Sequence, residues 1–401
     1  MKKLMVLGGS RYAIPVIKAA HELGIYVITA DYLPNNIAHQ YSDEYCNISI
    51  IDLETTLQAA QKRQIDGIIS FACDPGVVTA AYVAEKMGLP SVGSYESVSI
   101  LQNKKRFRKF LADNGFNVPM AKGYTKIEEA LSDVDIFHWP IIVKPTDSAG
   151  SKGVTRVDEP SKLRKAIGYA LSFSHNDEFI IEDFITQKGF SSDTDSFSVD
   201  GKLKFVSFNS QRFDRNAENP YTPAAFSWPS SMTNEHLKEL THEIQRLITL
   251  LDLKTSIYNI ETREGTDGKA YIMECSPRGG GNRLAECLEY ATGVKLIENA
   301  VRASVGMSIV DVEQKPYDGY WAEIVLHSNK DGVFESLWID ESLRNCIIEE
   351  DLWVKCGDKV QSFTAANYAI GTLILKFKSD EFLQKVMQNT DEYVKVILKE
   401  Q

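Results

Sequence analysis

The feature that most constrains the fold is a β-hairpin pattern beyond the middle of the chain. Two runs with alternating apolar residues, 256–263 and 270–276, flank the dipeptide Asp267-Gly268. Such a dipeptide is a strong hairpin signal, because both central residues of the tight turn then adopt positive φ. We therefore expect an antiparallel hairpin, with Asp267 and Gly268 forming a two-residue turn.

This hairpin would bring two carboxylates together. Counting outward from the two-residue turn places Glu261 opposite Glu274, with both side chains on one face. Facing side chains lie about 5 Å apart, so like charges repel there unless a cation lies between them. Mg²⁺ suits such a pair, since it completes its shell with phosphate and water; the alternative is an exposed hairpin with solvated glutamates. The same count predicts two further facing pairs: Asn259 with Ser276, and Arg263 with Ile272.

Short strands alternate with helices at the start of the chain. Apolar runs predict strands at 4–7, 26–30 and 65–71, with helices between them and at 77–87. This alternation predicts a parallel, doubly wound sheet that holds ligands near the carboxyl ends of its strands.

The first of these strands ends in a glycine pair that suggests a dinucleotide site. Gly8-Gly9 follows the first strand, and Asp31 closes the second. The loop lacks the G-x-G-x-x-G spacing that lets the backbone approach a pyrophosphate. We therefore expect the glycines to make a tight turn, and we do not expect a nicotinamide cofactor.

Charge, hydropathy and cysteine usage exclude several classes of protein. The formal net charge of −11, from 44 basic and 55 acidic residues, disfavours a nucleic-acid binder. No apolar run approaches the roughly 18 residues that span a bilayer. The apolar stretch near the first residue is also too short for a signal peptide, so we expect no membrane partner. The cysteines lack a C-x-x-C pair and are expected to be reduced thiols of a cytoplasmic protein: Cys46, Cys73, Cys275, Cys287, Cys346 and Cys356.

A buried strand followed by a loop of small residues predicts a phosphate site. The run 140–145 is apolar apart from Lys144, and residues 147–153 read D-S-A-G-S-K-G before the next strand. This is not a Walker A loop, which leads into a helix; it joins two strands and offers backbone N–H groups to phosphates. A buried lysine needs an anion, which a phosphate oxygen would supply. The alternative is a mobile surface hairpin.

Two further stretches flank this loop in sequence. Residues 101–110 carry five basic residues and no acidic one. As an amphipathic helix, this stretch would bury its apolar residues and leave most charges in solvent, namely Lys105, Arg106, Arg108 and Lys109. Residues 179–185 form an apolar run interrupted by Glu182 and Asp183, and the backbone of such a run can pair with an adenine edge.

In content and order, these segments resemble the ATP-grasp superfamily, and among its members L-amino-acid ligases and proteins similar to carbamoyl-phosphate synthase. The matching stretches are Asn103-Lys104 at the start of a helix, I-I-V-K-P, the small-residue loop, I-I-E-D-F-I, the glutamate hairpin, and E-x-x-x-R at residues 274–278. The resemblance covers nearly the whole chain. It implies mixed α/β and α+β architecture in three parts: a Rossmann-like, doubly wound N-terminal domain (1–103), a two-lobed ATP-grasp domain (104–304, small lobe about 115–185) and a C-terminal α+β lid (305–401). In the last part we expect strands at 320–327, 352–354 and 371–377, then a helix.

The resemblance also implies roles for individual residues. ATP would lie between the lobes, with Lys104 and Lys144 on its phosphates. Mg²⁺, or Mn²⁺ in its place, would be held by Glu261 and Glu274. The remaining nucleotide contacts would come from the small-residue loop (Ser148, Ser151, Lys152 and Gly153) and from the segment at the adenine (Glu182, Asp183, Phe184 and Ile185).

In such ligases a carboxylate attacks the γ-phosphate, and an amine then captures the acylphosphate. Catalysis of this kind depends on positioning and on neutralisation of charge by metal and cations, to which Lys144 would contribute. The resemblance gives Arg278 the oxyanion of the tetrahedral intermediate, a role that suits its planar donors.

Two positions depart from the family pattern. The metal strand often reads E-x-N, whereas this chain has Ser276; either Ser276 or the facing Asn259 would then complete the metal site, or Glu274 and phosphate would suffice. The usual ribose-binding glutamate is replaced by Ser191, which leaves Asp195 as a candidate for the ribose.

Two loops are candidates for substrate binding. Residues 278–283 read R-G-G-G-N-R and resemble the substrate loop of amino-acid ligases, where Gly280 allows close backbone approach. Arg283 would pair with a substrate carboxylate or, alternatively, form a salt bridge at a helix start. Arg212, in the polar loop 209–215, would hold an anionic substrate or lie on an ordinary surface.

The resulting hypothesis is an ATP-dependent, ADP-forming carboxylate–amine ligase that acts on an amino acid or a similar small carboxylate. Its partners would be the small-molecule carboxylate and amine, and a homodimer is compatible with the resemblance. The alternative is an ATP-binding regulatory protein of the same fold without turnover. Retention of Glu261, Glu274 and Arg278 argues for the ligase, because binding alone needs no oxyanion group.

Overall fold

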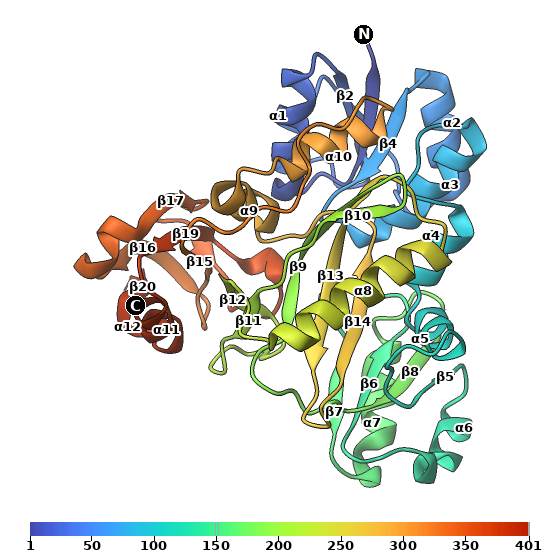
Figure 1. Ribbon diagram of the computed structural model, residues 1–401, viewed down its shortest axis with the longest axis vertical. Helices are drawn as coiled ribbons and strands as arrows, with labels where there is room; N and C mark the ends of the chain where they lie inside the picture. The colour runs from blue at the N-terminus through green and yellow to red at the C-terminus, as the bar shows by residue number, and fades with distance from the viewer. Residues whose placement is uncertain (149, 151, 400–401) are drawn as a thin grey trace.

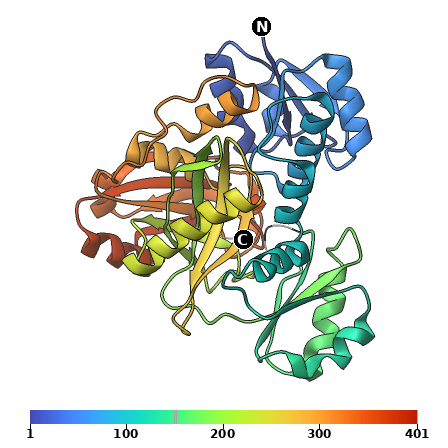
Figure 2. The same cartoon turned by 45° about the vertical axis from the view of Figure 1, so that its right-hand side comes forward.

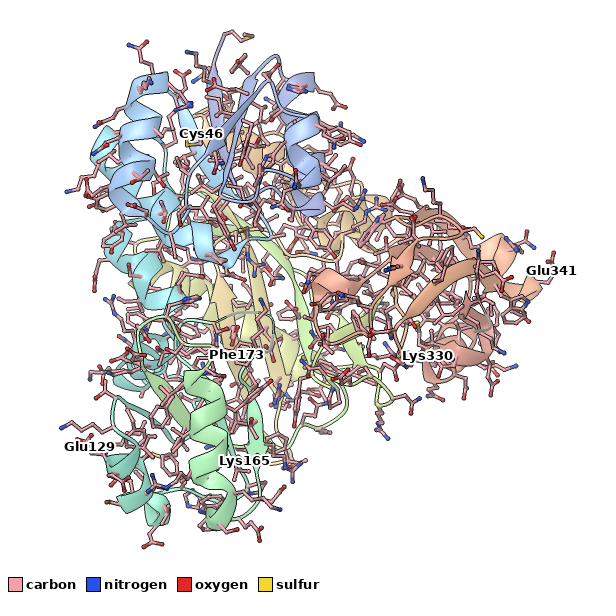
Figure 3. All side chains as sticks on the ribbon, turned by 180° about the vertical axis from the view of Figure 1, so that it is seen from behind. Cys46, Glu129, Lys165, Phe173, Lys330 and Glu341 are labelled. Atoms are coloured by element: carbon pink, nitrogen blue, oxygen red, sulfur yellow. The ribbon has the colours of Figure 1, made fainter. Side chains whose placement is uncertain are left out.

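The computed structural model describes residues 1–148, 150 and 152–399. These residues form five β-sheets with helices around them, which confirms the expected mixture of parallel α/β and antiparallel α+β architecture. In Figure 1 the N-terminal sheet lies at the top, the hairpin sheet at the centre, a small sheet at the bottom and the C-terminal strands at the left. Seen from behind, three protruding parts are marked by Cys46, Lys165 and Lys330 (Figure 3). None of the helices described combines the length and apolar character needed to cross a membrane.

The N-terminal sheet is parallel, with strand order β3-β2-β1-β4, as the alternation of strands and helices predicts. The strand β3 was not expected, because its sequence Glu-Tyr-Cys-Asn contains no apolar run. The elements are β1 (Lys3–Leu7), η1 (Arg11–Ala13), α1 (Ile14–Glu22), β2 (Tyr26–Asp31), η2 (Ile37–Gln40), β3 (Glu44–Asn47), α2 (Leu53–Arg63), β4 (Gly67–Ser70), η3 (Asp74–Gly76) and α3 (Val77–Met87).

Two helices, α4 (Tyr95–Gln102) and α5 (Lys104–Asp113), lead from this sheet to the small lobe (Figure 2). Asn103 follows the last residue of α4 and caps α5, because its side chain accepts a hydrogen bond from the backbone N–H of Arg106. This cap fixes Lys104 at the first position of α5.

The small lobe is an antiparallel sheet with strand order β5-β8-β6-β7, packed against α7. Its core is apolar and includes Val143, Ile167 and Ile181. The elements are β5 (Ala121–Tyr124), α6 (Ile127–Ser132), η4 (Val134–Ile136), β6 (Ile141–Pro145), β7 (Thr155–Val157), η5 (Pro160–Lys162), α7 (Leu163–Leu171) and β8 (Phe179–Asp183).

The central sheet contains the predicted hairpin, with strand order β10-β9-β13-β14 and α8 (Asn234–Leu250) against it. Glu261 faces Glu274, as predicted. The predicted two-residue turn is wrong: the connection spans residues 265–269, and a β-bulge after Glu261 restores the register. Beyond the bulge, Arg263 faces Tyr271 and not Ile272. The strands are β9 (Ser192–Val199), β10 (Lys202–Phe205), β13 (Ser256–Glu264) and β14 (Ala270–Ser276).

The C-terminal sheet combines two distant stretches of the chain. Its strand order is β11-β12-β15-β19-β17, so β11 (Ser210–Phe213) and β12 (Pro223–Trp228) leave the middle of the chain to join strands beyond residue 320. The strand expected at 352–354 ends instead at Leu352. The remaining elements are α9 (Leu284–Thr292), α10 (Leu296–Ser304), β15 (Tyr320–Leu326), β16 (Gly332–Ile339), η6 (Glu341–Cys346), β17 (Ile347–Leu352), β18 (Lys359–Val360), η7 (Ala366–Tyr368), β19 (Gly371–Phe377), α11 (Asp380–Gln388), α12 (Thr390–Tyr393) and β20 (Val394–Leu398).

One hydrophobic core joins the N-terminal and C-terminal sheets. It contains Val16 of α1, Leu288 of α9, Val301 of α10 and Trp321 of β15, all of them buried. The loop that follows β14 leads into α9, so this loop lies where the N-terminal, central and C-terminal sheets meet. All six cysteines are free.

Candidate functional site

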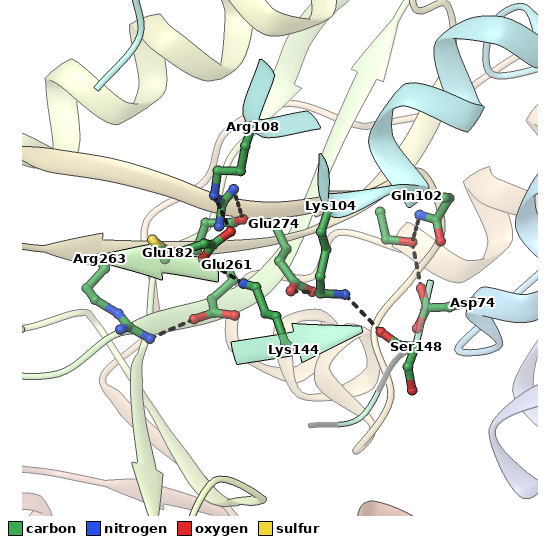
Figure 4. Close-up of polar contacts among 12 residues, drawn as sticks. Asp74, Gln102, Lys104, Arg108, Lys144, Ser148, Glu182, Glu261, Arg263 and Glu274 are labelled. Atoms are coloured by element: carbon green, nitrogen blue, oxygen red, sulfur yellow. Dashed lines mark hydrogen bonds and ion pairs between the residues drawn. The ribbon is translucent and has the colours of Figure 1, made fainter. Parts of the chain in front are cut away.

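The predicted cations and carboxylates meet where the small lobe faces the hairpin (Figure 4). The Nζ of Lys104 lies 3.4 Å from a carboxylate oxygen of Glu274 and donates a 2.8 Å hydrogen bond to the carbonyl of Ser148. The side chain of Glu274 is 47% exposed, so it remains open to solvent and to a ligand. Three of the predicted phosphate and metal residues are therefore neighbours, although they come from α5, β14 and the loop after β6.

A buried ion-pair group lies beside them. The carboxylate of Glu182 forms ion pairs of 2.9 Å with both Arg108 and Lys144. Burial alone would raise the pKa of Glu182, but Arg108 and Lys144 outweigh burial and lower this pKa to about 2. Lys144 is buried, as predicted, and Glu182 is the anion that pairs with it.

This group corrects the expectation that Arg108 is solvated. Its side chain is 3% exposed, and its guanidinium also donates to the carbonyl of Met273 on β14. The physical reason is the partner Glu182, which no local pattern around α5 reveals. The resemblance assigned Glu182 to adenine, but its carboxylate is paired with Arg108 and Lys144.

The other predicted nucleotide residues lie in the segment at the end of β8 and in the loop between β6 and β7. Asp183 accepts hydrogen bonds from the backbone and ring of His138, and Phe184 lies under the guanidinium of Arg156, 4.6 Å from it. Ile185 is half-buried, Gly153 is buried with φ of +72°, and Lys152 is exposed. Ser151, also assigned to the phosphates, lies outside the described residues.

The predicted metal pair has a third carboxylate beside it, which sequence reasoning missed. Asp193 of β9 faces Glu261 of β13 on the side away from Glu274. Burial and then the charge of Glu261 raise the pKa of Asp193 to about 7. The alternation of Asp193 and Asp195 with small residues was the available signal, but it has meaning only once β9 is known to pair with β13.

The donor set fits Mg²⁺ in an active site that also holds phosphate. Glu274 already faces a cation, the ammonium of Lys104, and Glu261 lies 3.1 Å from the guanidinium of Arg263. Within the described ranges, no three His, Cys, Asp or Glu side chains form a preformed metal site. A site of two carboxylates completed by phosphate and water is typical of Mg²⁺.

Asp74 of the N-terminal part joins the site and was also missed. Its carboxylate accepts two hydrogen bonds from Arg278, of 2.9 and 2.7 Å, and one of 2.8 Å from Ser276. Burial would raise the pKa of Asp74, but the guanidinium of Arg278 lowers it. An acid just beyond the carboxyl end of a parallel strand was the available signal.

The contact with Asp74 engages two residues that were predicted for the metal and for the oxyanion, Ser276 and Arg278. The hydroxyl of Ser276 donates to Asp74 and accepts from Gln102, so it is not free to complete a metal shell. Arg278 is held by Asp74 and by the carbonyl of Gly279, which fixes the plane of its guanidinium.

Asp195 does not lie in the segment that joins the lobes. Its position therefore gives no support to a ribose contact. It is fully buried on β9, where one carboxylate oxygen accepts hydrogen bonds from Gly280 (2.8 Å) and from Asn259 (3.2 Å). The facing pair of Asn259 and Ser276 is confirmed, but the amide of Asn259 is engaged by Asp195.

The two candidate substrate arginines already have protein partners. Arg283 pairs with Glu286, Glu349 and Asp351 at the start of α9, which is the salt-bridge alternative. Arg212 is buried, with its guanidinium over the ring of Phe190, and it donates to the backbone and side chains at three other positions: Ser210, Ser227 and Gln384. The structure therefore does not bring Arg212 to the hairpin carboxylates.

Comparison with known proteins agrees with this geometry. The family model that describes the ATP-grasp domain matches residues 137–286. The carbamoyl phosphate synthase large chain of Ralstonia nicotianae is 24% identical over 324 residues, which make up 77% of this chain and 30% of that protein. This chain therefore spans less than a third of the length of that relative.

Solved structures share the whole architecture. The L-amino acid ligase from Bacillus licheniformis has a TM-score of 0.81 at 18% identity and covers 100% of this chain and 99% of its own. Phosphoribosylglycinamide synthetase from Anaerococcus prevotii has a TM-score of 0.75 at 19% identity, over 99% of this chain and 100% of its own. At these identities the likeness shows the fold. Residues 137–286 therefore match the ATP-grasp domain, and the whole chain shares the fold of these solved structures.

Proposed function

We propose that this chain is an ATP-dependent, ADP-forming ligase that joins a small carboxylate to an amine through an acylphosphate. The observation that carries this proposal is the meeting of Lys104 with Glu274 and the small-residue loop, beside the buried Lys144. Phosphoryl transfer requires positioned cations more than covalent chemistry, and this arrangement supplies them. The carboxylate would be an amino acid or a similar small acid, as for the L-amino acid ligase that shares the fold.

Each side chain has a role in this reaction. Lys104 and Lys144 would neutralise the phosphates, and Glu261 and Glu274 would hold Mg²⁺ or Mn²⁺, which neutralises charge on the transferred phosphoryl group. Arg278, oriented by Asp74, would stabilise the oxyanion when the amine attacks the acyl carbon. The bond from that carbon to the phosphate oxygen then breaks and releases inorganic phosphate.

A solved relative in fold supports the cofactors. The biotin carboxylase domain of Hydrogenobacter thermophilus 2-oxoglutarate carboxylase, with a TM-score of 0.76, is described as a dimer in complex with MgADP and bicarbonate. We propose ATP with Mg²⁺ for this chain, a homodimer, and the division into an N-terminal domain, an ATP-grasp domain and a lid at residues 103/104 and 304/305.

One observation favours a second candidate, an ATP-binding regulatory protein without turnover. The donors of Arg278 and Arg283 already have carboxylate partners in the protein. In a regulatory protein these arginines would only join the sheets.

Release of ADP and phosphate from Mg·ATP, measured against amino acids singly and in pairs, tests the proposal. We expect release that depends on a pair and that falls by about a hundredfold in Glu274→Gln. Glu335→Gln makes the same charge change on an exposed residue of β16 and should release phosphate like the wild type. Tight ATP binding without release for any pair would favour the regulatory protein, and absence of ATP binding would overturn both candidates.

A further inference from the structure

The helix α5 presents two cations, one turn apart, to the strand β14. Lys104 and Arg108 are four residues apart, so they lie on the same side of the helix. The Nζ of Lys104 lies 3.4 Å from the carboxylate of Glu274. The Nη1 of Arg108 donates a 2.7 Å hydrogen bond to the carbonyl of Met273. Arg108 therefore holds the backbone of the residue directly before the predicted metal ligand Glu274, and Figure 4 shows both cations extending from α5 toward the site.

The same guanidinium also holds the small lobe. Its Nε forms the 2.9 Å ion pair with one carboxylate oxygen of Glu182 on β8. The other oxygen of Glu182 lies 2.9 Å from the Nζ of Lys144 on β6. A line of direct contacts therefore runs from β14 of the central sheet through Arg108 and Glu182 to Lys144. It joins the strand predicted to hold the metal to the lysine predicted to hold a phosphate.

Arg108 is placed to act through its neighbours and not on a ligand. The side chains of Arg108 and Glu182 are each 3% exposed, whereas that of Glu274 is 47% exposed. A bound nucleotide and its metal can therefore reach Glu274, while Arg108 stays behind the surface that they would contact.

Arginine is the residue type that this place requires. Its guanidinium is a rigid plane, so the nitrogens that bond to Met273 and to Glu182 keep a fixed separation. A lysine has a single nitrogen at the end of a flexible chain and cannot hold both groups apart in this way. The exchange Arg108→Lys therefore removes the fixed spacing but keeps the positive charge.

We propose that Arg108 is a positioning residue that keeps Lys144 and Glu274 at a fixed separation, so that nucleotide and metal are bound cooperatively. The inference rests on the proposed function, in which the phosphates and the metal must meet at one place. Misplacement of such groups by about 1 Å can lower a rate by about a hundredfold. The role also has an equilibrium consequence, because two ligands held in the correct relative position increase each other's affinity.

This coupling can be measured without turnover. Titration calorimetry on the full chain gives the Kd of ADP in EDTA and in excess Mg²⁺, and the ratio of these Kd values is the coupling. For wild type we expect a ratio of about 5 to 150, the usual size of such coupling. Arg108→Lys should lower the ratio by about fivefold or more. The Kd of metal-free ADP should stay within about threefold of wild type, because the charge at the phosphates is unchanged.

Two further variants show whether the effect belongs to the contacts of Arg108. Arg106→Lys makes the same exchange on the same helix, at a side chain that is 39% exposed and pairs with Glu96, and should keep the wild-type ratio. Glu182→Asp keeps the charge but shortens the carboxylate that joins Arg108 to Lys144, so it should lower the ratio as Arg108→Lys does. Melting curves show which variants are folded.

Several results would overturn the role of Arg108. One is a wild-type ratio in either Arg108→Lys or Glu182→Asp, whichever folds. Another is an equal loss of ADP affinity with and without Mg²⁺, and failure of both variants to fold would likewise assign Arg108 to the fold. Absence of any effect of Mg²⁺ on ADP binding to wild type would overturn the metal site and this role together.

Phosphate release separates this inference from the ligase function. With the pair of substrates that wild type uses, we expect kcat of Arg108→Lys to fall by about tenfold or more. Loss of the coupling in a chain that releases no phosphate with any pair would support the role of Arg108 and contradict the ligase. Unchanged coupling and unchanged kcat in Arg108→Lys would contradict the role of Arg108 and leave the ligase standing.

Discussion

At the scale of single residues, the least predictable feature is the group of Arg108, Lys144 and Glu182. The sequence identifies Lys144 as a buried lysine, because it ends an apolar strand. It does not identify Glu182 as the partner, since these positions are brought together only by the pairing of β6 with β8. For the same reason, Arg108 resembles any exposed arginine of a basic helix until Glu182 is placed beside it.

Removal of Glu182 should destabilise the small lobe. Glu182→Gln leaves the buried charges of Arg108 and Lys144 without their anion, so we expect the free energy of unfolding to fall by about 3 kcal/mol. Glu159→Gln, which breaks an exposed pair with Lys162, should leave the free energy of unfolding nearly unchanged. Urea unfolding followed by fluorescence measures both values; similar values for the two variants would contradict the assignment.

The buried Asp195 should make stability depend on pH near neutrality. Burial raises its pKa to about 7 in the folded protein, well above the value of an unfolded aspartate. The folded protein therefore binds the extra proton, and this stabilisation is present at low pH and is lost as pH rises through about 7.

Asp195→Asn isolates this effect. Between pH 6 and 8 the ligand-free wild type should lose about 1 kcal/mol of stability through this group, and the variant should lose correspondingly less. Urea midpoints at both pH values measure the difference. Parallel pH profiles for the two proteins would show that Asp195 is ionised across this range.

At the scale of elements, the hairpin shows how a correct pairing can follow from an incorrect turn. The facing of Glu261 and Glu274 was predicted from a two-residue turn, yet the connection is longer and a bulge offsets the difference. The pattern of apolar residues fixes which side chains share a face, whereas turn length and bulges depend on contacts elsewhere. Gly280 was predicted to allow close backbone approach to a ligand, and in the structure its N–H donates to the carboxylate of Asp195.

Gly280 should not tolerate a side chain. A Cβ there would lie 2.8 Å from both the amide of Asn259 and the side chain of Leu284, and 3.0 Å from Asp195. Gly280→Ala should therefore displace the loop, lower stability by about 1–3 kcal/mol and raise the KM for a substrate. Gly281→Ala is the matched control, since its nearest neighbour would be the ring of Tyr12 at 3.8 Å. Equal KM values in both alanine variants would contradict a role for the loop in substrate binding.

At the scale of the whole molecule, the order of motifs in the sequence indicated three parts of the chain. It did not indicate that strands from the middle of the chain join the C-terminal sheet. The parallel N-terminal sheet follows from local alternation. The C-terminal sheet does not, because β12 pairs with β15 across roughly a hundred residues, a separation that local patterns do not encode. The contact of Asp74 with Arg278 is of the same kind, since it joins the N-terminal sheet to the loop after β14.

The contact between Asp74 and Arg278 should affect catalysis more than folding. Asp74→Asn keeps the size of the side chain but removes the charge that orients Arg278, so we expect kcat for amide formation to fall by about tenfold or more. ATP affinity should remain within about threefold of wild type, because Lys104 and Lys144 are untouched. Nucleotide titration and steady-state kinetics measure the two quantities, and an equal loss of ATP affinity would assign Asp74 to the fold of the whole site.

The proposed reaction begins when a carboxylate attacks the γ-phosphate of ATP and becomes an acylphosphate. The most direct measurement uses the carboxylate substrate found by phosphate release, labelled with heavy oxygen, and follows the label by mass spectrometry. We expect one labelled oxygen atom in each inorganic phosphate released, because the carboxylate oxygen stays with phosphorus when the amine attacks. Unlabelled phosphate, or label in a nucleotide product, would contradict it.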